Sequence, residues 1–146
     1  MNISEIILDL HINSLYLIKN ISSKYHITSN QMVLLYAIPF TGISQTDLSN
    51  KLSIDVSTMS RNLKKLINSD LIYKEYDDYD KRQTNIKLTE KGEKLYHDFM
   101  IDLSNMLNNF NIDFEQSELE KSLNLLLKIN WYLSKKKLSC LLQFLY

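Results

Sequence analysis

Flexible and cross-linking residues are scarce in this chain of 146 residues, which has two glycines, one proline and one cysteine. With so few chain breakers, long helices are favoured, and the breakers are expected to mark the ends of elements. The two glycines, Gly42 and Gly92, lie too far apart to form a glycine-rich loop that cradles phosphate. The single cysteine, Cys140, excludes an internal disulfide and is compatible with a reducing cytosol.

An excess of charge of either sign is also lacking, since 17 basic and 17 acidic residues give a formal net charge of zero. Affinity for nucleic acid must then come from local clusters of basic residues rather than from bulk attraction. No apolar run approaches the length of a membrane span, and the N-terminus lacks the basic start of a signal peptide. We therefore expect a cytoplasmic protein with no membrane partner.

Catalytic and metal-binding patterns are not found in the sequence. His11, His26 and His97 are scattered without the spacing of metal ligands, and there is no cluster of cysteine and histidine. A phosphate loop, a dinucleotide-binding turn and a nucleophile elbow are all missing. We expect no enzyme activity, no catalytic residue, no metal and no cofactor.

The spacing of apolar residues predicts a single, mainly α domain with a small β-hairpin wing. Helix N-caps are expected at Ser4, at Thr28 or Ser29, at Ser44 and at Asp55. The expected helices run from residue 3 to about 22, from 29 to Pro39, from 45 to 52, from 56 to 70, from about 90 to about 110 and from about 116 to 134. The last has an extension or a separate short helix after it. Residues 71–76 and 83–89 are expected to be the two strands of the hairpin.

Two short helices joined by a tight turn and followed by a hairpin form a winged helix-turn-helix. In the second short helix, Val56, Met59, Leu63, Leu66 and Ile67 are expected to face the core. The opposite face carries hydroxyl and basic side chains and no acid, a composition suited to phosphates and base edges. The candidate DNA contacts are Ser57, Thr58, Ser60, Arg61, Lys64 and Lys65. The alternative is that this basic stripe is only a solvated surface.

Residues 57–92, STMSRNLKKLINSDLIYKEYDDYDKRQTNIKLTEKG, resemble the core signature of the MarR family of bacterial transcription factors. The matching positions are Ser57, Thr58, Ser60 and Arg61 in the recognition helix, Leu71 and Ile72 at the first wing strand, Asp80 and Arg82 in the wing, and Leu88, Thr89 and Gly92 before the next helix. One departure is Asp70, which stands where glycine is common and must take a left-handed conformation with some strain.

The resemblance implies a homodimer with intertwined terminal helices that binds a pseudo-palindromic operator in double-stranded DNA and represses transcription. Within the single domain 1–146, residues 28–92 would form the DNA-binding region, and residues 1–25 and 95–146 the dimerisation region. The terminal segments are rich in large apolar residues, which independently favours an obligate interface. The rival hypothesis is a winged-helix scaffold or anti-regulator that binds another protein and does not bind specific DNA.

The stretch DDYDKRQ, residues 77–83, is expected to form the tip of the wing. Asp80 would hold Arg82 in one geometry, so that the guanidinium loses less entropy when it enters a narrow minor groove. With Lys81 and Gln83, these residues are the candidate DNA contacts of the wing.

Two kinds of signal are suggested by the resemblance. A phenolic or anionic effector could bind near His11, Tyr16 and Tyr36, although aromatic residues at such positions are more often core or interface residues. An oxidant could act on Cys140, although a thiol in the apolar stretch LSCLLQF is more often an inert small hydrophobe.

Overall fold

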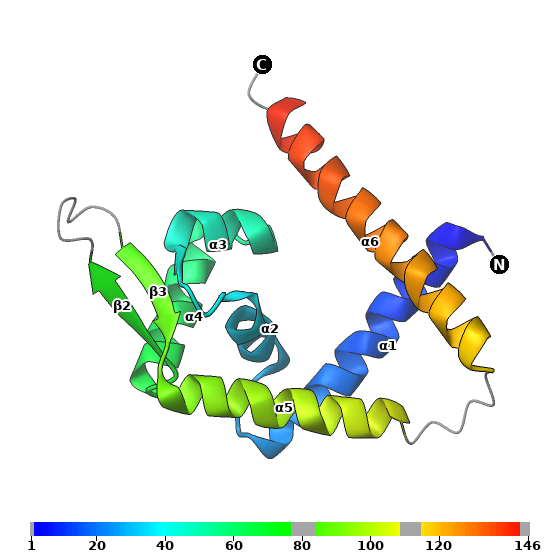
Figure 1. Ribbon diagram of the computed structural model, residues 1–146. Helices are drawn as coiled ribbons and strands as arrows, with labels where there is room; N and C mark the ends of the chain where they lie inside the picture. The colour runs from blue at the N-terminus through cyan, green and yellow to red at the C-terminus, as the bar shows by residue number, and fades with distance from the viewer. Residues whose placement is uncertain (1, 77–83, 109–114, 144–146) are drawn as a thin grey trace. The chain divides into compact units, whose positions relative to one another are not determined.

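The computed structural model describes residues 2–76, 84–108 and 115–143, with side chains described as far as Lys135. It divides into two units, residues 1–109 and 110–146 (Figure 1). The first unit holds α1 (Ile3–Lys24), α2 (Ser29–Ala37), β1 (Ile43–Ser44), α3 (Gln45–Leu52), α4 (Val56–Asn68), β2 (Ile72–Tyr76), β3 (Thr84–Leu88) and α5 (Glu90–Asn108). The second holds α6 (Gln116–Gln143), a single helix with no break after residue 134. No helix in the described part of the chain combines the length and apolar character needed to cross a membrane.

The core of the first unit lies between α2, α3, α4, the sheet and the start of α5. Its fully buried side chains come from α2, α3, α4 and the sheet and include Leu34, Leu35, Leu48, Met59, Leu63, Leu66 and Ile86, while α5 contributes Phe99, which is 4% exposed. Burying each such side chain contributes about 1.5–3 kcal/mol relative to leaving it in water. The hairpin of β2 and β3 projects from the place where α4 ends and α5 begins (Figure 1).

Polar side chains at the predicted positions begin most of the helices. Thr28, Ser44 and Asp55 cap α2, α3 and α4 by accepting a hydrogen bond from a backbone N–H in the first turn, as predicted. The predicted cap of α1 was wrong, because Asn2 rather than Ser4 occupies that position. Asn2 accepts from Ser4 N and Glu5 N, and Glu5 bonds back to Asn2 N in a capping box.

The sheet has three antiparallel strands in the order β1-β3-β2. Ile72 pairs with Leu88 and Tyr76 with Thr84, so the hairpin predicted from the sequence is confirmed. The short strand β1 was not expected, and its Ile43 pairs with Ile86 of β3. This pairing ties the turn before α3 to the wing.

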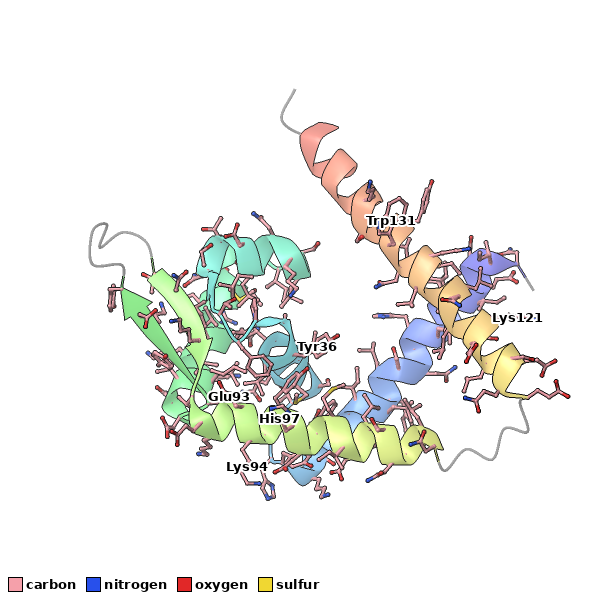
Figure 2. The ribbon with its side chains drawn as sticks, in the orientation of Figure 1. Tyr36, Glu93, Lys94, His97, Lys121 and Trp131 are labelled. Carbon is pink, nitrogen blue, oxygen red and sulfur yellow. The ribbon has the colours of Figure 1, made fainter. Side chains whose placement is uncertain are left out.

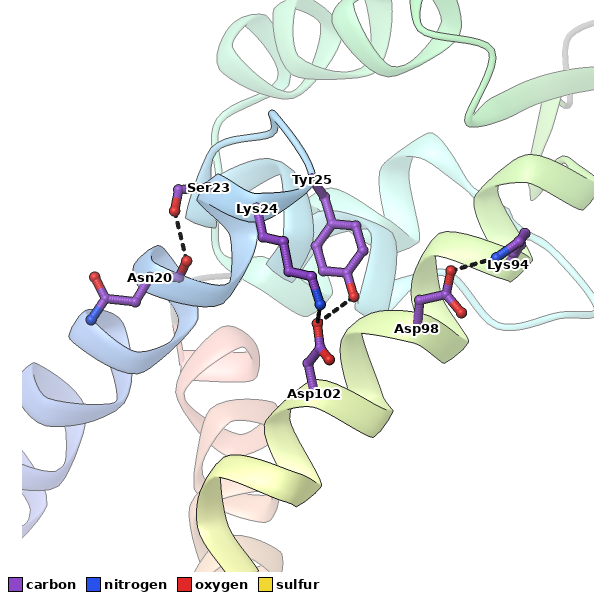
Figure 3. Close-up of polar contacts among 7 residues, drawn as sticks. All are labelled: Asn20, Ser23, Lys24, Tyr25, Lys94, Asp98 and Asp102. Atoms are coloured by element: carbon purple, nitrogen blue, oxygen red, sulfur yellow. Dashed lines mark hydrogen bonds and ion pairs between the residues drawn. The ribbon is translucent and has the colours of Figure 1, made fainter. Parts of the chain in front are cut away.

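Two side chains tie the end of α1 to α5. Lys24 Nζ and the Tyr25 hydroxyl both donate to Asp102 Oδ2, each at 2.6 Å (Figure 3). Partial burial, followed by the hydrogen bond to Asp102, raises the pKa of Tyr25 to about 12. The hydrogen bonds from Lys24 and Tyr25 lower the pKa of the Asp102 carboxyl. The network therefore favours the ionised form of Asp102 and the protonated form of Tyr25.

Most of α1 that precedes this network is exposed. Ile3, Leu8, Leu10, Ile12 and Tyr16 are all more than half exposed, and the buried residues of α1 are Ile21 and Ser22, near its end. Within the second unit, α6 exposes Leu123, Leu125, Leu127, Trp131 and Tyr132. Both terminal helices thus present large apolar side chains that the described part of their own unit does not cover.

Candidate nucleic-acid interface

The start of α4 is organised around the Asp55 carboxylate. Oδ1 of Asp55 accepts from the backbone N–H of Thr58 at 2.8 Å and from the Ser57 hydroxyl at 2.5 Å. These bonds, that from Ser57 foremost, hold the pKa of Asp55 well below its ordinary value. The preceding turn is tight because Ser53, the C-cap of α3, has a left-handed backbone with φ 53°. The two short helices are therefore joined in one defined geometry.

The two sides of α4 differ in burial, as predicted. Met59, Leu63 and Leu66 are buried in the core, at most 1% exposed. Ser57, Ser60, Arg61, Lys64 and Lys65 are exposed, whereas Thr58 is half-buried. No residue from Val56 to Asn68 is acidic. The structure thus gathers five of the six predicted recognition-helix residues on the solvent side of α4, and Thr58 lies at the edge.

The prediction that Val56 and Ile67 face the core was wrong. Val56 is 64% exposed and Ile67 is 37% exposed. With about 100° between successive residues, these side chains lie roughly 50° and 70° from the centre of the buried face. They are on its flank and at opposite ends of the helix, where neighbouring elements cover them less.

The base of the wing is a closely packed junction between α4, β2 and α5. Asp70 has a left-handed backbone with φ 57°, as expected where the family prefers glycine. The Thr89 hydroxyl donates to the Asp70 carbonyl at 2.7 Å, and Thr89 N donates to the Leu71 carbonyl at 3.1 Å. Gly92 N in turn donates to the Thr89 hydroxyl oxygen at 3.0 Å.

Gly92 is required by this junction because of its size. A Cβ atom at residue 92 would lie 2.0 Å from the Leu71 carbonyl oxygen, well inside van der Waals contact. The start of α5 can therefore approach the first wing strand this closely only with glycine at that position. The Leu-Thr-x-x-Gly part of the family signature thus has a steric explanation.

The wing strands carry little unpaired basic charge. Lys87 of β3 forms an ion pair with Glu75 of β2 at 2.6 Å, and the hydrogen bond to Glu75 raises the pKa of Lys87. Lys74 Nζ lies 3.5 Å from Gln45 Oε1 at the start of α3. The predicted wing contacts Asp80, Lys81, Arg82 and Gln83 lie outside the described residues.

An apolar cavity of about 200 Å³ lies among α1, α2 and α5. It is lined by Ile18, Met32, Val33, Tyr36, Phe99, Met100 and Leu103, none of them charged. Of the predicted ligand residues only Tyr36 reaches it. His11 and Tyr16 are exposed residues of α1 outside the lining. The other lining residues were missed because they come from three helices and are apolar like the core.

Aromatic side chains cluster around Tyr36, which lines this cavity; Figure 2 labels Tyr36 of α2 and His97 of α5. Tyr36 stacks on Tyr96 with ring centroids 6.2 Å apart, and Phe40 stacks on His97 at 5.9 Å. Phe40 also meets Tyr96 edge to face at 5.5 Å. The cluster joins α2 and the turn after it to α5, and leaves Tyr36 and Phe40 more than half exposed.

Neither a metal site nor a thiol site can be built from the described residues. No group of three or more histidine, cysteine, aspartate or glutamate residues among them could hold a metal ion. Cys140 lies in α6, and its side chain is outside the described part. The redox hypothesis for Cys140 stays a prediction.

Comparison with protein families decides what kind of protein carries this interface. The family model for the transcriptional regulator SarA/Rot matches residues 16–99, which is more than half of the chain and includes the helix-turn-helix and the wing. The chain belongs to the SarA/Rot family. Members of this family are transcriptional regulators, so the prediction that the protein is not an enzyme is confirmed. No curated protein sequence matches the chain significantly.

Solved structures show the same fold for this SarA/Rot member. A MarR protein from Peptoclostridium difficile has 22% sequence identity and a TM-score of 0.78, with 95% of this chain and 92% of the other covered. S. aureus MepR in a complex with DNA has 25% identity and a TM-score of 0.71, with 90% and 98% covered. Staphylococcus aureus MarR in complex with salicylate and kanamycin has 27% identity and a TM-score of 0.75, with 88% and 87% covered. The predicted MarR-like winged helix-turn-helix fold is confirmed.

Proposed function

We propose that this DNA-binding regulator acts as a homodimeric repressor, which binds a pseudo-palindromic operator and is released by a small aromatic ligand. The observation that carries the proposal is the outward face of α4. It combines hydroxyl groups with Arg61, Lys64 and Lys65 and has no acidic residue within the helix. In a chain of zero net charge, this local polarity favours contact with DNA over a merely solvated surface.

The side chains of α4 would have separate roles. Arg61 can donate two hydrogen bonds to a guanine, which is the most common base-specific contact in the major groove. Lys64 and Lys65 would neutralise phosphates and so contribute to binding at every sequence. In the wing, Arg82 would enter the minor groove, oriented by Asp80 and accompanied by Lys81 and Gln83.

Dimerisation is supported by the exposed apolar side chains of α1 and α6. Their number exceeds the scattered apolar residues of an ordinary monomer surface. Residues 95–133 also contain six acids and only two lysines, which disfavours DNA as the partner of this region. A symmetric dimer would place two copies of α4 in major grooves about 34 Å apart.

The apolar cavity is the best candidate for an effector site. A dry cavity of about 150 Å³ can hold a benzene ring, so about 200 Å³ is enough for one substituted ring. The lining residues described above include no cation, which favours a neutral phenolic ligand over an anionic one. Tyr36 supplies the hydroxyl that could orient it. Staphylococcus aureus MarR is in complex with salicylate, which supports the aromatic ring of the proposed ligand and, being a carboxylate, does not support its neutral charge.

The test is an anisotropy titration with the DNA upstream of the protein's own gene at two salt concentrations. Arg61→Ala should lose about 1–3 kcal/mol of binding to this DNA while its binding to unrelated DNA changes little. Lys64→Ala should weaken binding to both DNAs and reduce the salt dependence by about one unit of slope. Lys121→Ala removes an exposed lysine of α6 and is the control of matched charge. Equal affinity of wild type and Arg61→Ala would overturn the proposed role of Arg61.

The aromatic cluster in which Tyr36, Phe40 and His97 are exposed and Tyr96 is half-buried is the observation that favours the rival function, a protein-binding scaffold. Aromatic residues are enriched in protein interfaces and could anchor a partner. The same titration separates the two functions. Absence of salt-sensitive DNA binding by the wild-type protein would favour the scaffold.

A further inference from the structure

The N-terminal end of α4 carries one exposed apolar side chain among polar ones. Val56 is the first residue of the helix, on the flank of its buried face, and is 64% exposed, whereas the exposed residues that follow it in the first turns are Ser57, Ser60 and Arg61. Valine has no advantage in helix propensity over the polar residues common in a first turn. Its position is informative because the N-terminal residues of a recognition helix are those that reach base edges.

Ser57 restricts what this end of the helix can bind. Its hydroxyl proton is donated to Asp55 Oδ1 at 2.5 Å, and the low pKa of Asp55 keeps that carboxylate an acceptor. Ser57 Oγ therefore offers only lone pairs to a ligand. A phosphate oxygen is itself an acceptor, so Ser57 in this arrangement cannot donate to phosphate, but it can accept from the amino group of a base.

The carboxylate of Asp55 also disfavours phosphate at this end of α4. The nearest basic side chain in the helix, Arg61, comes more than one turn later. The edge of a base pair therefore matches the apolar Val56 side chain, the acceptor Ser57 Oγ and the Asp55 carboxylate better than the DNA backbone does. In the major groove, the only apolar group that a base presents is the C5 methyl of thymine.

We infer that Val56 is a specificity-determining residue that recognises a thymine methyl group in each half of the operator. The inference rests on the proposed function, because it requires α4 to enter the major groove. It adds a preference that hydrogen bonding by Arg61 does not supply. Burial of one methyl group at each of two symmetric sites makes a measurable contribution to sequence selection.

The test begins with selection of bound duplexes from two random DNA libraries, one made with thymine and one with uracil, which lacks the methyl group. Wild-type protein should enrich a site with a fixed thymine in each half from the first library, and lose that preference in the second. Replacing this thymine by uracil in the selected site should weaken wild-type binding about fourfold per half-site, as expected for one buried methyl group.

Variants identify the residue that is responsible. Val56→Ala should bind the thymine and uracil sites equally, whereas Ile67→Val, a control on the same flank at the other end of α4, should keep the wild-type ratio. The melting temperature of Val56→Ala should match the wild type because Val56 is 64% exposed, and Ile67→Val, which removes one methyl group from a side chain that is 37% exposed, should lower it only slightly. Equal wild-type affinity for the two sites, or an unchanged ratio in Val56→Ala, would overturn the inference and leave the proposed function standing. Failure to enrich any sequence from the thymine library would overturn the proposed function, and this inference with it.

Discussion

Substitution of Gly92 by alanine tests the junction at the base of the wing. The added Cβ would lie 2.0 Å from the Leu71 carbonyl oxygen, so the strand or the helix must move by more than 1 Å to reach ordinary contact. Such a movement would break the hydrogen bonds from Thr89 to Leu71 and Asp70, which measure 3.1 and 2.7 Å. Leu71 is 2% exposed, so its displacement would also disturb the core.

The opposing terms can be compared in size. Two lost hydrogen bonds cost about 1 kcal/mol each, and overpacking of the core costs about 1–3 kcal/mol. Alanine is better than glycine inside a helix by about 1 kcal/mol. We expect a net loss of about 3 kcal/mol in the free energy of unfolding, or a fall of about 6–12 °C in the melting temperature.

Urea denaturation followed by circular dichroism measures this loss. Ser104→Ala, at an exposed position of the same helix, is the control and should change stability by only a few tenths of a kcal/mol. A Gly92→Ala protein as stable as the wild type would refute the steric reasoning. It would show that α5 and the wing can separate without loss.

Two further predictions concern charge. Asp80→Ala should weaken DNA binding in an anisotropy titration although it removes a negative charge, because Arg82 would lose its orientation; tighter binding would exclude this role. Asp102→Asn should lower the melting temperature at pH 7. Because the folded-state pKa of Asp102 is lowered, its stabilising effect is present above the ordinary value of 3.8 and is lost as the pH falls through the folded value. The difference in melting temperature between wild type and Asp102→Asn should therefore narrow below pH 4, and a constant difference would contradict the assigned ionisation.

The sequence predicted those features that depend on neighbouring residues in the chain. The caps at Thr28, Ser44 and Asp55 and the buried stripe of α4 follow from local spacing and side-chain chemistry. Strand β1 is different, because two residues carry no periodicity and Ile43 becomes a strand residue only by pairing with Ile86.

The wrong or missing predictions at the candidate site also concern contacts between elements that lie far apart in the sequence. Val56 follows the apolar spacing of α4, yet its exposure depends on where the neighbouring elements end, which spacing does not record. The cavity is formed by Ile18, Met32 and Phe99 with other residues of three helices, and none of these differs in type from core residues. Tyr36 could be predicted as a ligand residue because its side chain carries a hydroxyl group.

The single residue Thr89 between β3 and α5 has a mechanical consequence. Because Thr89 is hydrogen-bonded to Asp70 and Gly92, the end of α4, the base of the wing and the start of α5 are held together in one junction. Phe99, Met100 and Leu103, which line the cavity, lie further along the same helix. In the proposed dimer, a ligand that displaces these side chains would tilt α5 together with α4 and the base of the wing. The spacing of the two α4 helices would then change, while the structure within each winged helix-turn-helix stays the same.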